Sequence, residues 1–252
     1  MIYKYKNINI NYTFYKNNSD KSLVFLHGWG QNIQMMMPIA KPFIKKYDTL
    51  IIDLPGFGQS EEPKEVWSIY DYSEMVNSLV KELGLKNEML VGHSFGGKIS
   101  LAYAIKYKPS KIVLLASPYR VKIKKDDFKT KSFKALKKIP VLNKLEKIAK
   151  KYVGSEDYRN ASDMMRKVLV QHVNLDLSKD AKNVECPTLL IWGTLDTAVP
   201  YKDALDLEKI IKDAGLVTYE GCTHYAYLER VGQTVNVLKS FIGDEKKWKY
   251  YM

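Results

Sequence analysis

The sequence predicts an α/β protein, with a mostly parallel central sheet, helices on both faces and an all-helical insertion. Three observations lead to this class: apolar runs of strand length recur along the chain, segments with helical spacing separate them, and glycine-rich turns follow several of them. The apolar runs lie at residues 22–26, 49–53, 88–92, 111–116 and 188–192. Because strands alternate with helices, we expect parallel pairing through right-handed crossovers.

The elements before residue 118 follow this alternation. Residues 2–15 alternate aromatic or β-branched residues with polar ones, a pattern typical of an antiparallel hairpin. Residues 35–47 have the length of a helix, but because two prolines interrupt them, the sequence does not determine where this helix begins and ends. Residues 70–83 carry apolar side chains at helical spacing and end at a glycine, and residues 95–107 form the helix after the third apolar run.

The alternation stops at Tyr119. From there to residue 184 the sequence contains only helical patterns, at residues 126–139, 141–153 and 156–173, the last with Ser155 as its expected N-cap. After the strand at 188–192 come a helix, a strand and a closing helix, at residues 202–214, 216–219 and about 225–242. We therefore expect an α/β core of residues 1–118 and 185–252, with a helical cap of residues 119–184 inserted into it.

The chain carries a net charge of +12, and most of this charge lies in one segment. Residues 120–151 contain thirteen Lys or Arg against three acids, a balance of +10 that leaves +2 for the other residues. A basic chain can bind nucleic acid, but no helix-turn-helix, RNP or zinc pattern accompanies this charge. We therefore expect no nucleic-acid partner.

Features of membrane, secreted and metal-binding proteins are missing from the sequence. No run of about 18 apolar residues predicts a membrane span, and the first residues lack the apolar core and cleavage site of a signal peptide. Cys186 and Cys222 are too few for a disulfide framework and have no metal-type spacing with the histidines. We expect a cytoplasmic protein with reduced cysteines and no bound metal.

One motif indicates nucleophilic catalysis. Residues 92–96, Gly-His-Ser-Phe-Gly, directly follow an apolar run and fit G-x-S-x-G. This pattern is typical of a sharp strand-to-helix turn that exposes one serine hydroxyl, with glycines where backbone approaches backbone. Ser94 is therefore the candidate nucleophile, and the alternative is an ordinary serine in a tight turn.

A serine nucleophile needs a neighbouring base, and the base needs an acid that fixes its tautomer and stabilises its charged form. Among the four histidines, His224 follows the last predicted strand, in a loop that can reach the carboxyl edge of the sheet. Asp196 follows another strand end and is the candidate acid, with Asp203 and Asp206 as alternatives. The order Ser94, Asp196, His224 is one of the known chain orders of catalytic triads.

These motifs resemble the α/β-hydrolase superfamily, in its branch of serine hydrolases with a helical cap. The resemblance covers about residues 22–242 except the cap, and its matching segments are 27–30, 53–60, 92–97, 192–196 and 221–224. In this family, backbone N–H groups after His-Gly and after the nucleophile bind the oxyanion. The resemblance thus implies that Trp29 and Phe95 form an oxyanion hole, in which each donor contributes about 3 to 4 kcal/mol to transition-state stabilisation.

The predicted activity is hydrolysis of a carboxylic ester through an acyl-enzyme, without a metal or organic cofactor. A cap above the strand ends forms the roof of the pocket, and the candidates for contact with a small-molecule ester are His93, Phe128, Tyr158 and Met165. Two other functions stay open: hydrolysis of a C–C bond in a β-diketone-like compound, which uses the same triad, and ligand binding without catalysis.

The lysine-rich cap also suggests an acidic partner that carries the ester, such as an acyl carrier protein. The biotin-pathway esterases of this superfamily act on such an ester, and the chain resembles them at residues 26–30, Leu-His-Gly-Trp-Gly. Binding of an acidic carrier to a basic surface depends on salt. A solvated helix face that binds no partner is the alternative.

Overall fold

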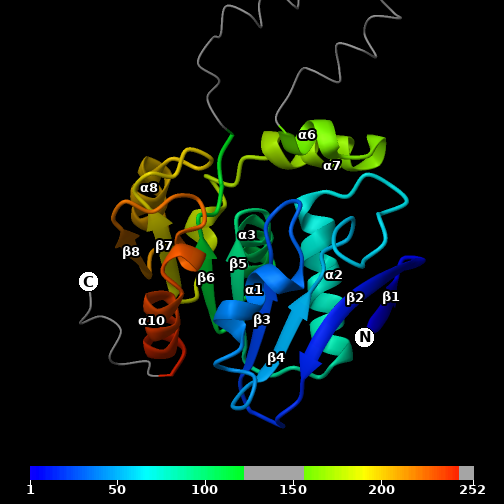
Figure 1. Cartoon of the computed structure of the whole chain (residues 1–252), viewed down its shortest axis with the longest axis horizontal. Helices are drawn as coiled ribbons and strands as arrows, with labels where there is room; N and C mark the ends of the chain where they lie inside the picture. The colour runs from blue at the N-terminus through cyan, green and yellow to red at the C-terminus, as the bar shows by residue number, and fades with distance from the viewer. Residues whose placement is uncertain (122–155, 244–252) are drawn as a thin grey trace, which may run out of the picture.

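The computed structural model describes residues 1–121 and 156–243. Its strands are β1 (Ile2–Tyr5), β2 (Ile8–Tyr15), β3 (Ser22–Leu26), β4 (Asp48–Ile52), β5 (Glu88–His93), β6 (Lys111–Leu115), β7 (Thr188–Gly193) and β8 (Ala214–Tyr219). They form one eight-stranded sheet in the order β1-β2-β4-β3-β5-β6-β7-β8 (Figure 1). From β4 to β8 the neighbours pair in parallel, whereas β1 and β2 form an antiparallel hairpin that pairs with β4 through β2. The predicted fold class and the predicted hairpin are confirmed.

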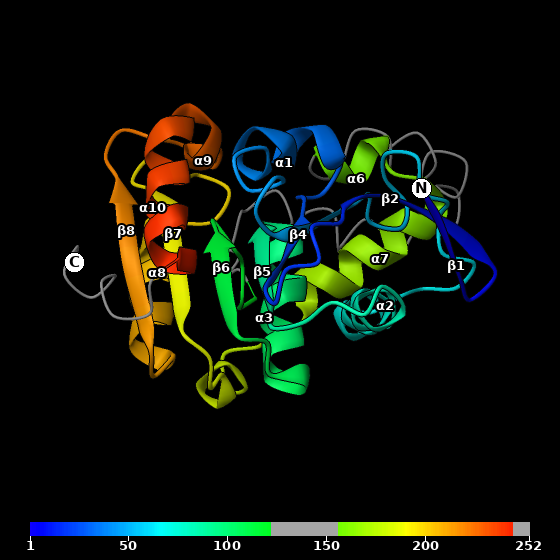
Figure 2. The same ribbon diagram turned by 90° about the horizontal axis from the view of Figure 1, so that it is seen from below.

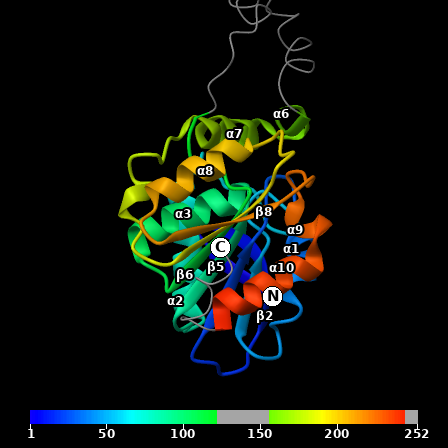
Figure 3. The same ribbon diagram turned by 90° about the vertical axis from the view of Figure 1, so that its left-hand side faces the viewer.

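Helices cover both faces of the sheet. One face carries α1 (Ile33–Ala40), α9 (Ala226–Glu229) and α10 (Val231–Gly243), and the other carries α2 (Ile69–Glu82), α3 (Phe95–Tyr107) and α8 (Tyr201–Ile210) (Figure 2, Figure 3). In β3, Leu23 and Phe25 pack in the cluster with α1 and α10, whereas Val24 and Leu26 pack in the cluster with α2 and α3. A strand that is buried on both faces needs apolar residues throughout, which explains the continuous apolar runs of the sequence.

Side-chain caps determine where two of these helices begin. Before α2, the Ser68 hydroxyl accepts the backbone N–H of Asp71 at 3.3 Å, and the Asp71 carboxylate accepts that of Ser68 at 2.8 Å, which forms a capping box. Asn32 caps α1, so this helix begins at Ile33 and ends at Ala40. The helix, whose ends the sequence does not determine within residues 35–47, thus begins two residues earlier and ends at Ala40, since Pro42 supplies no N–H to continue the hydrogen-bond ladder.

The described part of the segment between β6 and β7 is helical, with α6 (Glu156–Asn160), α7 (Asp163–Asn174) and the 3-10 turn η2 (Ala181–Asn183). Helices α6 and α7 lie beyond the carboxyl ends of the strands (Figure 1). The prediction of one helix over residues 156–173 is wrong, because the Ser162 hydroxyl accepts the N–H of Met165 and starts a second helix. The predicted helices at 126–139 and 141–153 and the predicted N-cap Ser155 lie outside the described residues.

The two ends of this segment meet beside α8. The backbone N–H of Leu177 donates a 2.7 Å hydrogen bond to the carbonyl oxygen of Tyr119. The next residue, Arg120, forms ion pairs with Asp203 and Asp206 of α8. The chain therefore passes the same point at Tyr119 and at Leu177, before it continues to β7 at Thr188, and the limits of the predicted cap at residues 119–184 stay a prediction.

The C-terminal elements differ from the prediction in their limits. The closing helix is divided into α9 and α10 at Arg230, whose backbone has φ −128° and ψ 49°, so a single helix over residues 225–242 is wrong. Helix α8 ends at Ile210, which leaves room for β8 to begin at Ala214. Within residues 1–121 and 156–243, every helix is too short or too polar to cross a membrane.

Candidate active site

Ser94 lies at the sharp turn between the end of β5 and the start of α3. Its backbone has φ +48° and ψ −107°, a left-handed conformation that costs a non-glycine residue about 1–3 kcal/mol. A Cβ atom on Gly96 would lie 2.3 Å from the carbonyl oxygen of Leu26, and one on Gly92 would lie 2.4 Å from that of Gly96. The two glycines are therefore required by the close approach of β3, β5 and α3, as the motif predicts.

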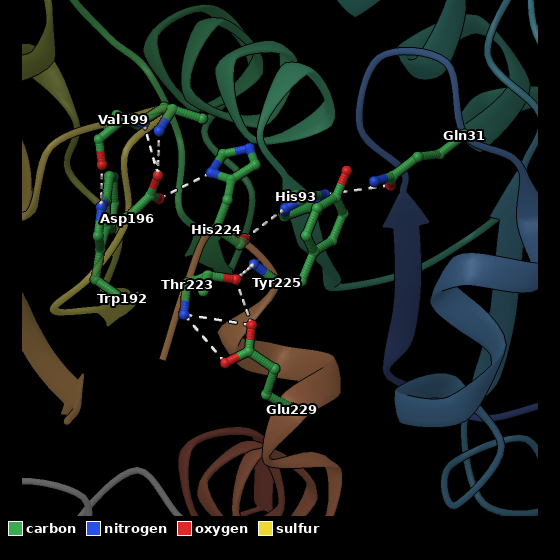
Figure 4. Close-up of polar contacts among 10 residues, drawn as sticks. Gln31, His93, Trp192, Asp196, Val199, Thr223, His224, Tyr225 and Glu229 are labelled. Atoms are coloured by element: carbon green, nitrogen blue, oxygen red, sulfur yellow. Dashed lines mark hydrogen bonds and ion pairs between the residues drawn. The ribbon is translucent and has the colours of Figure 1, made fainter. Parts of the chain in front are cut away.

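His224 and Asp196 form a hydrogen-bonded pair. Nδ1 of His224 lies 2.8 Å from Oδ2 of Asp196, whose side chain is fully buried (Figure 4). The other carboxylate oxygen accepts the backbone N–H groups of Ala198 and Val199, both at 2.8 Å. Because a carboxylate accepts, Nδ1 carries the proton and Nε2 of a neutral His224 is free to act as a base.

The alternative acids lie elsewhere. Asp203 accepts a hydrogen bond from Nε of Arg120 at 3.1 Å, and Asp206 accepts one from the same guanidinium at 3.0 Å. This contact lowers the pKa of the Asp206 carboxyl below its usual value, although partial burial acts in the opposite direction. Both carboxylates therefore anchor the segment that begins at Arg120, and Asp196 is the carboxylate beside the imidazole.

The loop of residues 221–225, here called the base loop, is held by contacts on two sides. The N–H and hydroxyl of Thr223 both donate to the carboxylate of Glu229 on α9 (Figure 4). These bonds lower the pKa of the Glu229 carboxyl. On the other side, the N–H of Leu195 donates to the carbonyl of Cys222 at 2.9 Å. The base loop is thus fixed to the loop that carries Asp196.

The loop after β3, here called the oxyanion loop (residues 27–31), is held by His27. Nδ1 of His27 donates to the carbonyl of Gly28 at 2.7 Å, and Nε2 accepts the N–H of Leu54 at 2.9 Å. The Gly28 carbonyl and the Trp29 N–H belong to one planar peptide group, so His27 fixes the direction of that N–H. Burial lowers the pKa of His27 to about 4, which keeps the ring neutral, as one donor and one acceptor require.

The two predicted oxyanion donors are available. Phe95 is the first residue of α3, and the N–H groups of a first helical turn have no partner within the helix. Among the described residues, no hydrogen bond uses the N–H of Trp29 or of Phe95. The rings of the two residues contact each other edge to face, with centroids 5.2 Å apart. The helix dipole of α3 also favours negative charge at this end.

A cavity of about 400 Å³ opens below α6 and α7. Its lining is formed by the oxyanion loop, the turn after β4, α6, the start of α7 and the base loop; the residues are Trp29, Gly30, Gln31, Gly56, Phe57, Glu62, Glu156, Asp157, Asn160, Ala161, Ser162, Met165 and Tyr225. Trp29 carries a candidate oxyanion donor, and Tyr225 follows His224 in the chain. The cavity therefore lies beside the groups that the sequence assigns to catalysis.

Of the four predicted substrate contacts, Met165 lines this cavity. His93 does not, because it is 0% exposed and packed behind His224, with ring centroids 4.9 Å apart. Tyr158 does not line it either, since its ring lies against the guanidinium of Arg166, 5.6 Å from the ring centroid. His93 and Tyr158 are therefore not part of the wall of this cavity, and their contact with a substrate stays a prediction. Phe128 lies outside the described residues.

Sequence reasoning missed the carboxylates of the cavity wall. Glu62, Glu156 and Asp157 come from a loop and from α6, where no periodic pattern indicates which side chains face a pocket. Burial, followed by the charge of Glu156, raises the pKa of Asp157 above its usual value. In the described ranges, no group of three His, Cys, Asp or Glu side chains is arranged to hold a metal ion.

Comparison with known proteins gives several matches. A family model described as alpha/beta hydrolase fold matches residues 21–130, and one described as TAP-like protein matches residues 166–244. Lipase 1 of Psychrobacter immobilis is 28% identical over 256 residues, which cover 89% of this chain and 78% of the lipase. The pimeloyl-[acyl-carrier protein] methyl ester esterase of Aliivibrio fischeri is 23% identical over 244 residues, which cover 87% of this chain and 93% of the esterase.

A solved structure agrees with the fold. MGS-M2, an alpha/beta hydrolase enzyme from a Medee basin deep-sea metagenome library, superposes with a TM-score of 0.79 over 98% of both chains, at 22% identity. The two family models, together with the serine turn and the Asp196–His224 pair, identify this chain as a member of the α/β-hydrolase superfamily.

Proposed function

We propose that the protein is a carboxylic ester hydrolase that works through an acyl-enzyme. The Ser94 oxygen attacks the ester carbonyl carbon while Nε2 of His224 takes the hydroxyl proton. His224 then gives this proton to the leaving alcohol, and the C–O bond of the ester breaks. A water molecule repeats the attack with His224 as base, which releases the carboxylic acid and restores Ser94.

The observation that carries this proposal is the bond between His224 and Asp196. Its 2.8 Å length and the burial of the carboxylate fit an acid that orients a base and stabilises the imidazolium. The two backbone N–H groups that donate to Asp196 hold the carboxylate in place. A histidine with only a structural role does not require a buried charge as its partner.

The N–H groups of Trp29 and Phe95 complete the proposed site. They come from the oxyanion loop and from the first residue of α3, and both are without a partner among the described residues. In the tetrahedral intermediate, negative charge develops on the former carbonyl oxygen, which these donors bind. Preorganised donors of this kind are a feature of acyl transfer.

The lipase and the methyl ester esterase described above support an ester as the substrate class. Nothing in the site favours a C–C bond over an ester, and the paired base and acid give no support to ligand binding without catalysis. An acidic carrier protein as partner stays a prediction of the sequence. Most of the basic segment that suggests this partner, residues 122–151 of this chain, lies outside the described residues. Cytoplasmic localisation is likewise a prediction.

The test uses purified protein and p-nitrophenyl esters of increasing chain length. The wild type is expected to hydrolyse at least one of them, and Ser94→Ala is expected to lose the activity by about 10⁴-fold or more. A fluorophosphonate probe should add one mass adduct to the wild type and none to Ser94→Ala. Ser110→Ala, at an exposed serine remote from the site, is the control. Hydrolysis at an equal rate by Ser94→Ala would exclude the proposed mechanism.

A further inference from the structure

A buried chain of hydrogen bonds joins the oxyanion loop, the serine turn and the base loop. The N–H of Gly28 donates to Oε1 of Gln31 at 2.9 Å, and the same oxygen lies 3.2 Å from Nδ1 of His93. Nε2 of His93 lies 3.1 Å from the backbone carbonyl oxygen of His224 (Figure 4). His93 is 0% exposed, so water does not replace these contacts.

Both neighbours of the His93 ring are hydrogen-bond acceptors. The carbonyl of His224 can only accept, and Gln31 presents its oxygen to the ring because the N–H of Gly28 donates to that oxygen. A neutral imidazole has one N–H. In the described part of the chain, His93 is the donor that reaches the His224 carbonyl, and a buried carbonyl without a donor costs about 1–3 kcal/mol. The proton therefore belongs on Nε2.

A doubly protonated ring would satisfy both acceptors, but the surroundings oppose it. Burial, and then the neighbouring imidazole of His224, lower the pKa of His93 to about 3. Gln31 supplies no negative charge, and the third imidazole nearby, His27, also lowers this pKa. The rings of Tyr225 and Tyr227, with centroids 5.4 Å and 4.7 Å away, enclose the remaining sides. His93 is therefore a neutral donor of one hydrogen bond.

We infer that His93 is a positioning residue for His224, whose backbone it holds through an Nε2–H bond to the carbonyl. This inference rests on the proposed function, in which His224 is the base. The Asp196 bond fixes the rotation of the His224 ring, whereas the His93 bond fixes the backbone that carries it. Because His93 precedes Ser94 in the chain, the bond ties the backbone of His224 to the residue next to the nucleophile. A displacement of about 1 Å between such groups lowers a rate about 100-fold.

The tautomer of His93 can be measured without a substrate. The chain has four histidines, so long-range ¹H–¹⁵N NMR spectra can resolve every imidazole. His93 is expected as the Nε2–H tautomer. His27 is an internal reference with the opposite tautomer, because it donates from Nδ1 to Gly28 and accepts the N–H of Leu54 at Nε2. An Nδ1–H tautomer at His93 would overturn the inference.

Two substitutions test the hydrogen bond donated by Nε2 separately from the space that the ring fills. In His93→Gln an amide N–H can take the position of Nε2, whereas in His93→Asn it lies near the position of Nδ1. We expect kcat to fall about 100-fold in His93→Asn. In His93→Gln, kcat should be at least about tenfold higher than in His93→Asn. KM should change less than about twofold in both, because His93 does not line the cavity. Equal losses of kcat in two folded variants would show that the ring only fills space.

A final readout separates this inference from the proposed function. The proton that His224 shares with Asp196 over 2.8 Å is expected to give a low-field NMR resonance in the wild type and His93→Gln. In His93→Asn the resonance should broaden or disappear, with circular dichroism confirming that the protein is folded. If this pattern appears but no ester is hydrolysed, the proposed function fails and the positioning role stands. An unchanged resonance in His93→Asn contradicts the positioning role, whatever the activity.

Discussion

The ammonium group of Lys98 on α3 donates a 2.8 Å hydrogen bond to the backbone carbonyl of His172 on α7. A second bond, of 2.6 Å, goes to the carbonyl of Leu175, so one buried lysine caps the C-terminal end of α7. The ring of His172 packs edge to face on Phe95, with centroids 4.8 Å apart, and parallel to the ring of Trp29. The helix that begins at the serine turn therefore also holds the roof above the oxyanion loop.

Replacement of Lys98 should loosen α7 in a way that depends on pH. Lys98→Met leaves two carbonyls without their donor and is expected to lower the free energy of unfolding by about 1–3 kcal/mol at neutral pH. Burial lowers the pKa of Lys98 to about 8, so between pH 8 and about 10.4 the unfolded chain binds more protons and this residue adds stability as pH rises.

Urea denaturation of both proteins at several pH values measures this difference. The gap in unfolding free energy between wild type and Lys98→Met should widen from pH 8 to pH 10, by at most about 1.4 kcal/mol per pH unit. Lys106→Met, at an exposed lysine of the same helix, is the matched control. A gap that stays constant over this range would contradict the assignment of a buried, titrating amine.

Asp196→Asn should reduce kcat by about 10⁴-fold at neutral pH. The amide oxygen can still accept from Ala198 and Val199, but its NH₂ group then donates to Nδ1 of His224. This moves the ring proton to Nε2, where the base must be unprotonated. Steady-state kinetics with a p-nitrophenyl ester measures the loss, and Asp206→Asn should change kcat less than about twofold. A large loss in the Asp206 variant would reopen the choice of the acid.

His172→Phe should make the protein more resistant to acid. Burial, and then the nearby Lys98, lower the pKa of His172 to about 3, and Nδ1 has no hydrogen-bond partner among the described atoms. Between pH 6.5 and pH 3 the unfolded chain therefore binds the extra proton, and stability falls as pH decreases. From pH 7 to pH 5 the wild type should lose about 2 kcal/mol more than the variant, as measured by urea denaturation. Parallel losses in both proteins would refute this account.

Met165→Ala should widen the cavity and shift the preference for acyl chain length. Met165 is 2% exposed, lines the cavity and packs against Gly56, where an added Cβ would lie 2.4 Å from its sulfur. Each additional CH₂ group buried by a longer ester contributes about 0.8 kcal/mol, close to fourfold in kcat/KM. The ratio of kcat/KM for octanoate over acetate should therefore rise. Met165→Leu, which nearly conserves volume, serves as the control and should leave this ratio within about twofold.

The sheet and the pairing of His224 with Asp196 could be predicted because both follow from simple geometry. Strands buried on both faces are apolar at every position, so β3, β4 and β6 are visible as continuous runs. The carboxyl ends of parallel strands share one edge, which brings the residues after β5, β7 and β8 together. The 2.8 Å contact between two residues 28 positions apart follows from this arrangement.

Other features depend on contacts that the sequence does not display. The break at Ser162 requires its side chain to accept the N–H of Met165 instead of facing solvent within one long helix. The cavity wall combines side chains from irregular loops, so Glu62 and Asp157 follow no period. The sequence does not distinguish a histidine that lines a pocket from one that is buried behind it. For His93, the contacts with Gln31 and with the His224 carbonyl show that it lies behind the base.

The 2.7 Å bond between Leu177 and Tyr119 has a consequence for the engineering of this enzyme. Because Tyr119 and Leu177 are neighbours in space, we expect that residues 120–176 can be exchanged as a cassette without altering the order of the strands. A cassette transplanted from another hydrolase would bring its own roof while Ser94, Asp196 and His224 keep their supports in the scaffold. New selectivity can then arise in this stretch, provided that the replacement supplies a ring in the place of His172 against Trp29 and Phe95.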